Sequence, residues 1–268
     1  MAMKKQKLRR TEYDIKNGFE KKDLSNLDLR KTDLKNKVLK GVSFKGSDLR
    51  GVNLKHVDLS GCDFSGADLR CADMECANLT KALAISTNFA GADLNHATFD
   101  KAILNYCDFT GADLQDAWFH DTKMSTVDFD RALMVDANFK NACLNWVSFD
   151  NTDAESIQFE DCNYKAVSFK NGRMVSADFN GDRISNIDMS YADLSKANFE
   201  FVWFHEMNFK RTSMRFANLK NTQLGSFNPN QIDLHGIEYS KIGEHIIYDN
   251  INDVSEAEWL TMHQYSPK

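Results

Sequence analysis

Large apolar side chains recur at every fifth position along most of this 268-residue chain. Stepping by five from Leu24 to Leu224 gives 41 positions, and 39 of them carry Leu, Phe, Met, Ile or Tyr, the exceptions being Ala84 and Ala154. Fifteen of the 19 phenylalanines fall in this register. Neither an α-helix nor an ordinary strand has a five-residue period. The pattern therefore predicts a backbone that turns a corner every five residues and sends one large side chain inward per face.

The two residues before each large side chain also follow a pattern. The first is usually small or β-branched, as at Ala67 and Val127, and the second is Asp or Asn at 24 of the 41 positions. Asx side chains hydrogen-bond to nearby backbone groups and stabilise tight turns. We therefore expect the small residue to face inward, and the Asp or Asn to support the corner.

Runs such as Gly66-Ala67-Asp68-Leu69-Arg70 and Cys76-Ala77-Asn78-Leu79-Thr80 resemble the pentapeptide-repeat family, whose signature is A-(D/N)-(L/F)-x-x. The resemblance covers about 200 of the 268 residues. It implies an all-β, right-handed quadrilateral β-helix, a solenoid of roughly ten coils with four pentapeptides in each. Because the register is unbroken from 24 to 224, we expect no looped-out insertion unless its length is a multiple of five.

The register divides the chain into three predicted segments: a basic N-terminal cap or tail (1–22), the β-helix (23–224) and a C-terminal cap (225–268). Pro229 interrupts the register because it cannot donate to a ladder, and Leu234 and Tyr239 return to it. Ser255-Glu256-Ala257-Glu258 is typical of a capping box and predicts a short helix. The resemblance implies that such an element caps the rod or forms a homodimer, and both alternatives stay open.

Charge is distributed unevenly along the chain, whose formal net charge is −6. Residues 23–92 carry 10 bases and 9 acids, residues 93–161 carry 4 bases and 14 acids, and residues 162–224 carry 9 bases and 6 acids. At about 4.8 Å per coil the middle segment spans about 17 Å, a length over which B-DNA carries about 10 phosphate charges. The candidate partner-binding residues of this acidic belt are Asp93, Asp100, Asp113, Asp116, Asp121, Asp128, Asp130 and Asp136.

The acidic belt has two interpretations. The charge density favours DNA mimicry, and the family resemblance implies DNA gyrase or another DNA-handling enzyme as the protein partner. Against this, many of these acids are the Asp of the repeat, whose simpler role is to stabilise a turn. The Qnr-type gyrase-protecting members of the family also project loops from their coils, and the unbroken register here provides none.

A second candidate surface is apolar. With 20 residues per coil, outward positions on one face carry the apolar stripe Leu83, Ile85, Ile103, Tyr106, Trp146 and Trp203. A contiguous apolar patch rimmed by polar residues marks an interaction surface, and aromatic residues are its usual anchors. The alternative is local: Ala84 leaves space in the core, which Leu83 or Ile85 fills by turning inward. The stripe predicts a protein–protein adaptor, scaffold or effector-type protein.

The column His56, Cys76 and His96, with Glu75 near it, offers ligand types that suit zinc. Side chains stacked in parallel do not naturally converge on a tetrahedral point, and His56 and His96 are about 10 Å apart at this spacing. The sequence therefore predicts neither a metal site nor a cofactor here. Cys71 and Cys76 are expected to point outward, and nothing in their surroundings activates them.

The sequence predicts a non-catalytic protein. It contains no Walker A, dinucleotide-binding, HExxH or GxSxG motif, and a rod with flat sides offers no cleft for a small-molecule substrate. No secretion signal or transmembrane segment is recognisable, and six cysteines are too sparse for a disulfide framework. We therefore expect a cytoplasmic location and free thiols.

Overall fold

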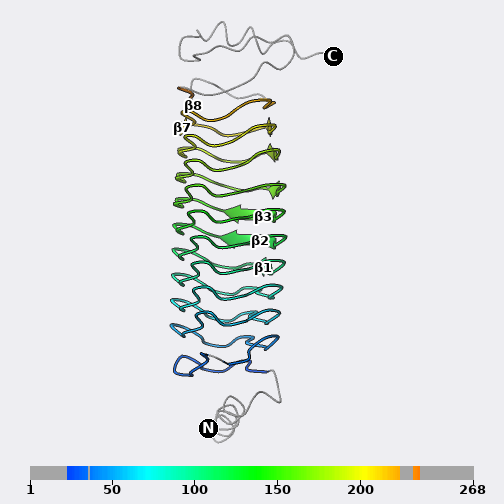
Figure 1. Cartoon of the computed structure of the whole chain (residues 1–268), viewed down its shortest axis with the longest axis vertical. Coiled ribbons are helices and arrows are strands. Elements are labelled where there is room, and N and C mark those ends of the chain that lie inside the picture. Colours follow the sequence, from blue (N-terminus) through cyan, green and yellow to red (C-terminus); the bar gives the residue numbers. More distant parts are fainter. Residues whose placement is uncertain (1–22, 36, 224–231, 236–268) are drawn as a thin grey trace, which may run out of the picture.

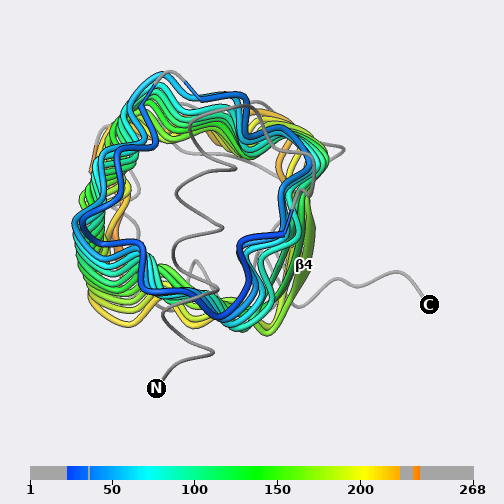
Figure 2. The same cartoon turned by 90° about the horizontal axis from the view of Figure 1, so that it is seen from below.

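The computed structural model describes residues 23–35, 37–223 and 232–235. Over these residues the chain winds into a tube that is four-sided when viewed along its axis (Figures 1 and 2). Parallel bridges join positions 20 residues apart, as in the series Asp28, Asp48 and Asp68. The ladder from 23 to 223 therefore comprises about ten coils. The all-β quadrilateral β-helix predicted from the sequence is confirmed.

Regular strands concentrate on one side of the tube. They are β1 (Ile103–Asn105), β2 (Lys123–Asp128), β3 (Cys143–Ser148), β4 (Asn163–Lys165), β5 (Arg183–Ser185) and β6 (Trp203–His205), with β7 (Thr212–Ser213) and β8 (Ile232–Asp233) elsewhere on the wall. The parallel sheets are β1-β2-β3-β4, β5-β6 and β7-β8. The remaining coils are joined by isolated bridges.

The corner beside β1–β6 differs from the others. At most corners a backbone N–H closes the turn, as where Ala67 donates to the carbonyl of Phe64 at 2.8 Å. β2 and β3 instead run through this corner and pair Val127 with Val147. The inward small position is Val127 in β2 and Val147 in β3, and valine favours extended backbone. Valines at other corners, such as Val42 and Val52, keep the turn hydrogen bond, so the residue type alone does not open this corner.

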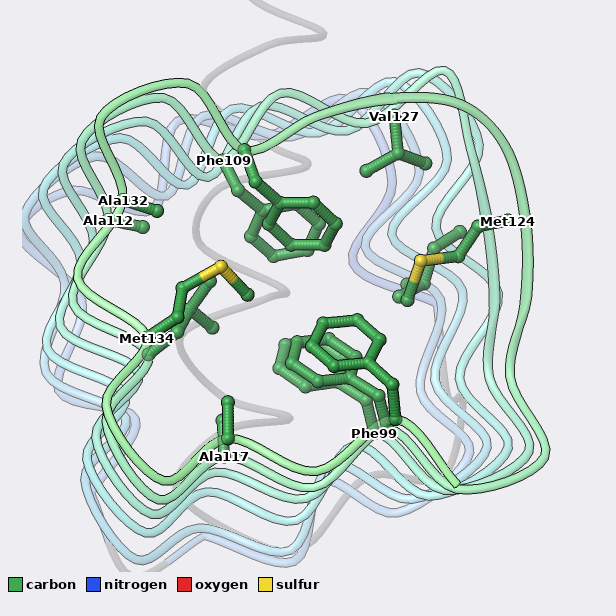
Figure 3. Close-up of a cluster of buried hydrophobic side chains, with 14 of the residues drawn as sticks. Phe99, Phe109, Ala112, Ala117, Met124, Val127, Ala132 and Met134 are labelled. Carbon is green, nitrogen blue, oxygen red and sulfur yellow. The ribbon is translucent and has the colours of Figure 1, made fainter. Parts of the chain in front are cut away.

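The core is a continuous column along the axis. Of the 40 described positions in the five-residue register, all are buried except Tyr164. Two phenylalanine ladders face each other across the axis (Figure 3). One comprises Phe89, Phe109, Phe129, Phe149 and Phe169, and the other Phe99, Phe119, Phe139, Phe159, Phe179 and Phe199. Successive rings stack 4.6–5.4 Å apart, which matches the rise of one coil.

Nearly every described corner places a residue in the left-handed conformation two positions after the large core side chain. Among the described residues, thirty non-glycine residues and eight glycines have a positive φ there, from 51° at Glu206 to 77° at Gly181. A side chain in this conformation is strained, which is why glycine is common at it. Eight of the nine glycines in the described ranges mark these corners, a signal that the five-residue apolar pattern alone did not use.

The inward small position also links neighbouring coils. Ser47 Oγ donates to the carbonyl of Leu24 at 2.6 Å, and Cys107 Sγ donates to that of Ala84 at 2.8 Å. One pair departs from the predicted apolar core. Asp182 occupies a small position and is 2% exposed, and its carboxylate accepts a 2.6 Å hydrogen bond from the hydroxyl of half-buried Tyr164.

The predicted caps fall mostly outside the described residues. This applies to 1–22, to Pro229 and Tyr239, and to the predicted helix after Ser255. The boundaries of the three segments, the homodimer and the cap therefore stay predictions. Leu234, which was expected to return to the core register, is 3% exposed.

Candidate partner-binding surfaces

The apolar stripe points outward from the face that carries β1–β6. Ile85 and Ile103 are each 36% exposed, while Leu83 is half-buried and pairs with Ile103 in the ladder. Ala84 is fully buried without either neighbour turning inward. The structure therefore excludes the inward alternative for Ile85, and the space beside Ala84 is taken up within the core.

Tyr106 and Trp146 are the most exposed members of the stripe, each 61% exposed. Both occupy left-handed corner positions, with φ of 59° and 57°. Because a left-handed corner directs its side chain away from the tube axis, these two rings project beyond the flat wall. The corner that follows β1 and that β3 runs through thereby carries two aromatic anchors on one edge of the rod.

The stripe is not continuous, in contrast to the prediction. Lys123 pairs with both Ile103 and Cys143 in the ladder, so one polar coil separates Tyr106 from Trp146. Trp203 lies beyond two further exposed polar positions, Asn163 and Arg183. The contiguous apolar patch therefore comprises Leu83, Ile85, Ile103 and Tyr106. Trp146 lies on the far side of one polar coil, and Trp203 is separated from the other members of the stripe.

The acidic belt covers three faces of the tube and leaves the fourth free. The 20-residue coil places its residues in three groups: Asp128 and Asp130; Asp93, Asp113, Asp116 and Asp136; and Asp100 and Asp121. The wall segments on the stripe face within 93–161 contain no acid. The structure therefore does not gather the belt on one surface, but places it on both sides of the apolar patch.

Half of the belt acids accept backbone hydrogen bonds. Asp93, Asp113 and Asp128 each accept the N–H of the residue two positions on, at 2.8–3.2 Å. Asp100 accepts the N–H of His120 at 3.2 Å. These four have the structural role that the sequence offered as the simpler interpretation. The other four acids are better placed to contact a partner.

Those four acids occupy corner or flanking positions. Asp116 lies 3.7 Å from His96 and Asp121 lies 3.9 Å from Lys101. Asp130 pairs with Arg131 at 2.9 Å, and the side chain of Asn151 donates to it at 2.6 Å. Asp136 is exposed at a left-handed corner. Asp121 and Asp136 are exposed, whereas Asp116 and Asp130 are half-buried.

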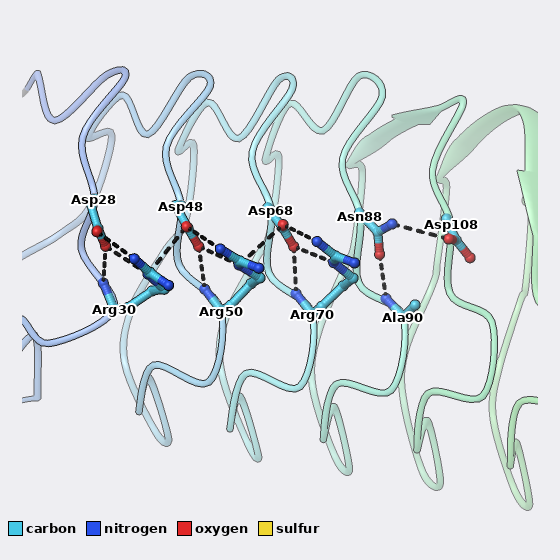
Figure 4. A network of polar contacts seen from close by, with 9 residues as sticks. All are labelled: Asp28, Arg30, Asp48, Arg50, Asp68, Arg70, Asn88, Ala90 and Asp108. Carbon is cyan, nitrogen blue, oxygen red and sulfur yellow. Dashed lines mark hydrogen bonds and ion pairs between the residues drawn. The ribbon is translucent and has the colours of Figure 1, made fainter.

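Near the N-terminal end, the face that carries Asp128 and Asp130 has a different arrangement, the Arg–Asp ladder (Figure 4). It consists of the pairs Asp28 with Arg30, Asp48 with Arg50 and Asp68 with Arg70, each joined by two hydrogen bonds of 2.7–2.9 Å. Arg30 and Arg50 also reach the Asp of the next coil, at 3.2 and 3.4 Å. The ladder stops where position 90 is alanine.

The arginines of this ladder keep its acids ionised. The side-chain hydrogen bond from Arg30 lowers the pKa of Asp28 from 3.8 to about 2. Hydrogen bonds from Arg50 and Arg70 lower the pKa of Asp48 and Asp68 in the same way. Charge on this part of the rod is therefore neutralised in pairs, which makes it a poor candidate for an electrostatic partner site.

Several exposed aromatic residues were missed by the sequence analysis. Trp118 is 49% exposed and packs its ring 4.9 Å from that of His120. Nearer the C-terminal end, Tyr191, Phe201 and Phe216 are exposed at corners, and the guanidinium groups of Arg211 and Arg215 approach two of these rings at 5.9 Å. All of them stand at outward positions of the register, so reading every column would have found them.

Two groups of metal-ligand side chains lie close together among the described residues. One comprises His56, Glu75 and Cys76, and the other Asp73, Glu75 and Asp93. In the second group, the Asp73 oxygens accept hydrogen bonds from Asn53 and the Glu75 N–H, and Asp93 accepts one from the Asn95 N–H. Asp73 and Asp93 therefore stabilise the local backbone. The thiol of Cys76 and the imidazole of His56, in the first group, have no such role.

Family comparisons agree with the repeat geometry. A family model described as "Pentapeptide repeats" matches residues 23–61, 47–83, 84–116 and 185–228, and one described as "Pentapeptide repeat region" matches residues 102–179. Together they cover about three quarters of the chain. The chain belongs to the pentapeptide-repeat family. A comparison with curated protein sequences found no match.

Solved structures of several pentapeptide-repeat proteins are similar to this chain. HetL, involved in heterocyst differentiation regulation in the cyanobacterium Nostoc, is 21% identical, with a TM-score of 0.35 over 73% of this chain and 86% of HetL. QnrB1, a plasmid-mediated fluoroquinolone resistance protein, is 16% identical, with a TM-score of 0.41 over 61% of this chain and 93% of QnrB1. Within the described part of this pentapeptide-repeat protein, no helix is long and apolar enough to cross a bilayer.

Proposed function

We propose that this protein is a rigid, non-catalytic rod that binds a protein partner through its apolar stripe. The observation that carries the proposal is the exposure of Tyr106 and Trp146, each 61%, on the face that the acidic belt leaves free. Aromatic rings on a rigid backbone lose little conformational entropy on binding, and they are typical anchors of interfaces. The charged residues beside the stripe indicate the charge that the partner should carry.

Acids flank the stripe on both neighbouring faces. Asp128 and Asp130 lie on one side and Asp100 and Asp121 on the other, within a segment of 14 acids and 4 bases. We therefore expect a partner with an apolar centre and a basic rim. The charges accelerate and orient association, while the aromatic anchors supply most of the affinity. The free cysteines support a reducing, cytoplasmic setting for this function.

The test compares tryptophans on two faces. Partners are captured from a lysate with the wild-type protein and with Trp146→Asp, and the affinity of each captured protein is then measured. We expect Trp146→Asp to weaken a true partner by about 30-fold or more, the effect of losing a hot-spot anchor. Trp118→Asp is the matched control, since Trp118 is exposed on a different face. Equal affinities for wild type and Trp146→Asp would contradict the proposal.

A second candidate function, DNA mimicry towards DNA gyrase or a similar enzyme, is favoured by the belt's excess of 14 acids over 4 bases. The structure sharpens its test, because only half of the belt acids are free of backbone turns. We expect the variant Asp116→Asn, Asp121→Asn, Asp130→Asn, Asp136→Asn to lose inhibition of gyrase supercoiling, with a reduced salt dependence. The control changes Asp28, Asp48, Asp58 and Asp68 to Asn, since three of these acids are already paired with arginine. Undiminished inhibition by the belt variant would exclude this function.

A further inference from the structure

One corner of the tube brings together a thiol, an imidazole and a carboxylate. His56 and Cys76 occupy the same corner in successive coils, at φ of 59° and 55°, and Glu75 immediately precedes Cys76. One donor atom from each of the three side chains lies within 4.8 Å of the other two. The sequence analysis considered the stack His56, Cys76 and His96 and expected no convergence. The structure replaces His96 with Glu75, whose longer side chain reaches across the coil boundary.

These donors suit zinc in type and in spacing. Zinc binds thiolate sulfur, imidazole nitrogen and carboxylate oxygen at about 2.0–2.3 Å, so donors of a tetrahedral site lie about 3.4–3.7 Å apart. To bring the donor atoms from within 4.8 Å of one another to this spacing, side-chain rotations must move them by about 1 Å. His56 is exposed, and Glu75 and Cys76 are half-buried at the surface. Nothing on the wall has to move for the three donors to meet.

The backbone holds the three residues at a fixed separation. The N–H of His56 donates to the carbonyl of Glu75 at 2.9 Å, and the N–H of Cys76 donates to that of Asn95 at 2.8 Å. His96, one coil further on, has its Nδ1 3.7 Å from Asp116. The corner is therefore preorganised by the ladder, which reduces the entropy lost when a metal binds.

Lys55 provides a second interaction at this corner. Its ammonium group pairs with Oε2 of Glu75. The pair leaves Oε1 of Glu75 for a metal. Binding of a dication with release of the Cys76 thiol proton raises the net charge of this corner by one, which the ammonium group of Lys55 opposes. The ammonium group also competes with the metal for the carboxylate, so its removal is expected to strengthen metal binding.

We propose that His56, Glu75 and Cys76 form a zinc site on the surface of the rod, with a fourth coordination position open to water or to a donor from a partner. Binding releases the thiol proton of Cys76, because thiolate is the zinc ligand. The site lies about three coils from the centre of the acidic belt and stands independently of the proposed function. It is assigned from three converging donors of different chemistry on a rigid frame.

The experiment uses the full chain stripped of metal and titrated with Co²⁺, then with Zn²⁺. We expect one Co²⁺ per chain and a sulfur-to-cobalt charge-transfer band, displaced by Zn²⁺. Cys76→Ser abolishes the band, while His56→Ala and Glu75→Gln each weaken Zn²⁺ binding by more than about 100-fold, beyond the 10–100-fold typical of outer-shell partners. Lys55→Met strengthens Zn²⁺ binding several-fold.

Matched controls separate this site from chance binding. Cys71→Ser removes another exposed thiol at a left-handed corner, and Lys101→Met removes a lysine that lies near Asp121. Both are expected to leave the band and the Zn²⁺ affinity unchanged, and circular dichroism checks that every variant keeps its fold. A band that survives in Cys76→Ser, or Zn²⁺ affinity equal in wild type and in all three donor variants, overturns the proposal and leaves adventitious binding only.

Discussion

The Arg–Asp ladder shares its face of the tube with two acids of the belt, Asp128 and Asp130, but the two regions differ in charge. Asp48 and Asp128 stand at equivalent positions four coils apart, and each accepts the N–H of the residue two positions on, at 3.3 and 2.8 Å. That residue is Arg50 in the first case and Asp130 in the second. The charge of the turn Asp is thus neutralised by an arginine in the first region, whereas a second acid follows it in the other.

This difference shows which positions of the repeat carry functional charge. The Asp of the signature has a structural role wherever it receives a backbone N–H, so its presence says little about function. The residue two positions later faces solvent and is not constrained by the turn. The surface charge of a pentapeptide rod is therefore controlled by the last two residues of each repeat, which is where Asp116, Asp121, Asp130 and Asp136 lie.

The core beneath these two regions also differs. In the column under the Arg–Asp ladder the inward residues are Leu29, Leu49 and Leu69, and the same column under the belt continues with stacked phenylalanines from Phe89 to Phe169. Leucine packs without preferred orientation, whereas ring stacking adds a directional contact between coils. The belt, with its unbalanced acids, is thus built over the more strongly coupled core.

The largest expected effect comes from breaking this phenylalanine ladder. Phe129 stacks on Phe109 at 4.9 Å and on Phe149 at 5.1 Å, and it is fully buried. We expect Phe129→Ala to lower the free energy of unfolding by about 3–5 kcal/mol, because it leaves a cavity and removes two ring contacts. Urea denaturation followed by circular dichroism measures the change.

Leu69→Ala is the matched substitution in the N-terminal part of the same column. We expect it to cost less, at the lower end of the roughly 2–5 kcal/mol range for leucine, because no ring stack is lost. A larger loss for Leu69→Ala than for Phe129→Ala would show that the two parts of the core are not coupled as the stacking geometry indicates.

Asp182 contrasts with the acids of the Arg–Asp ladder. Its carboxylate is buried, and its hydrogen bonds come from Tyr164 and Cys162 rather than from an arginine. Burial raises the pKa of Asp182 to about 7, although the hydrogen bonds from Tyr164 and Cys162 lower it. The neighbouring charges of Asp161 and Asp178 also raise this pKa. The unfolded chain ionises near 3.8, so Asp182 costs stability as pH rises from about 4 to about 7. We expect Asp182→Asn to add about 2–4 kcal/mol at pH 8, where the native charge is removed.

The pH profile distinguishes this cause from a change in packing. Wild-type stability should fall between about pH 4 and 7 and then level off, while the Asn variant should lack that fall. Asp136→Asn is the control, since Asp136 is exposed and lies more than two coils from Asp182. An unchanged slope in Asp182→Asn would mean that Asp182 stays ionised in the folded protein, and the expected gain at pH 8 would then be absent.

The comparison also shows how far the sequence determines the fold and the candidate sites. The five-residue period predicted the corners, the inward residues and the outward direction of Tyr106 and Trp146, while the four-sided β-helix followed from the resemblance to the pentapeptide-repeat family. The period did not foresee that Asp182 takes a small inward position, because the hydroxyl of Tyr164 that satisfies it comes from the preceding coil. The sequence also placed Glu75 near the column of His56 and Cys76 but did not predict that the three donors converge, since a column shows which residues stack but not how far a long side chain reaches.

The continuity of the apolar stripe was overpredicted for a related reason. Lys123 and Arg183 stand in the same column as Ile103 and Trp203, and the sequence analysis selected the apolar members without the polar ones between them. The corner beside the stripe, which opens into β2 and β3, required knowledge of which turns keep their hydrogen bond. The valines of that column did not supply this knowledge, because Val42 and Val52 keep the turn hydrogen bond at other corners.

The smallest effect on stability is expected from the Arg–Asp ladder itself. Arg30→Gln removes the guanidinium that lowers the pKa of Asp28, so that pKa should rise from about 2 toward 3.8. Stability at neutral pH should scarcely change, because exposed ion pairs contribute little. In the wild type, the contribution of this pair is present above pH 3.8 and is lost as pH falls through about 2, and the variant should lose that acid dependence. NMR titration of the Asp28 carboxyl measures the shift, and Lys45→Gln, which removes a base on another face, should leave it unchanged. A pKa for Asp28 that stays near 2 in Arg30→Gln would assign the shift to the backbone turn instead, and the ladder would then differ from the belt in charge but not in how it holds its acids.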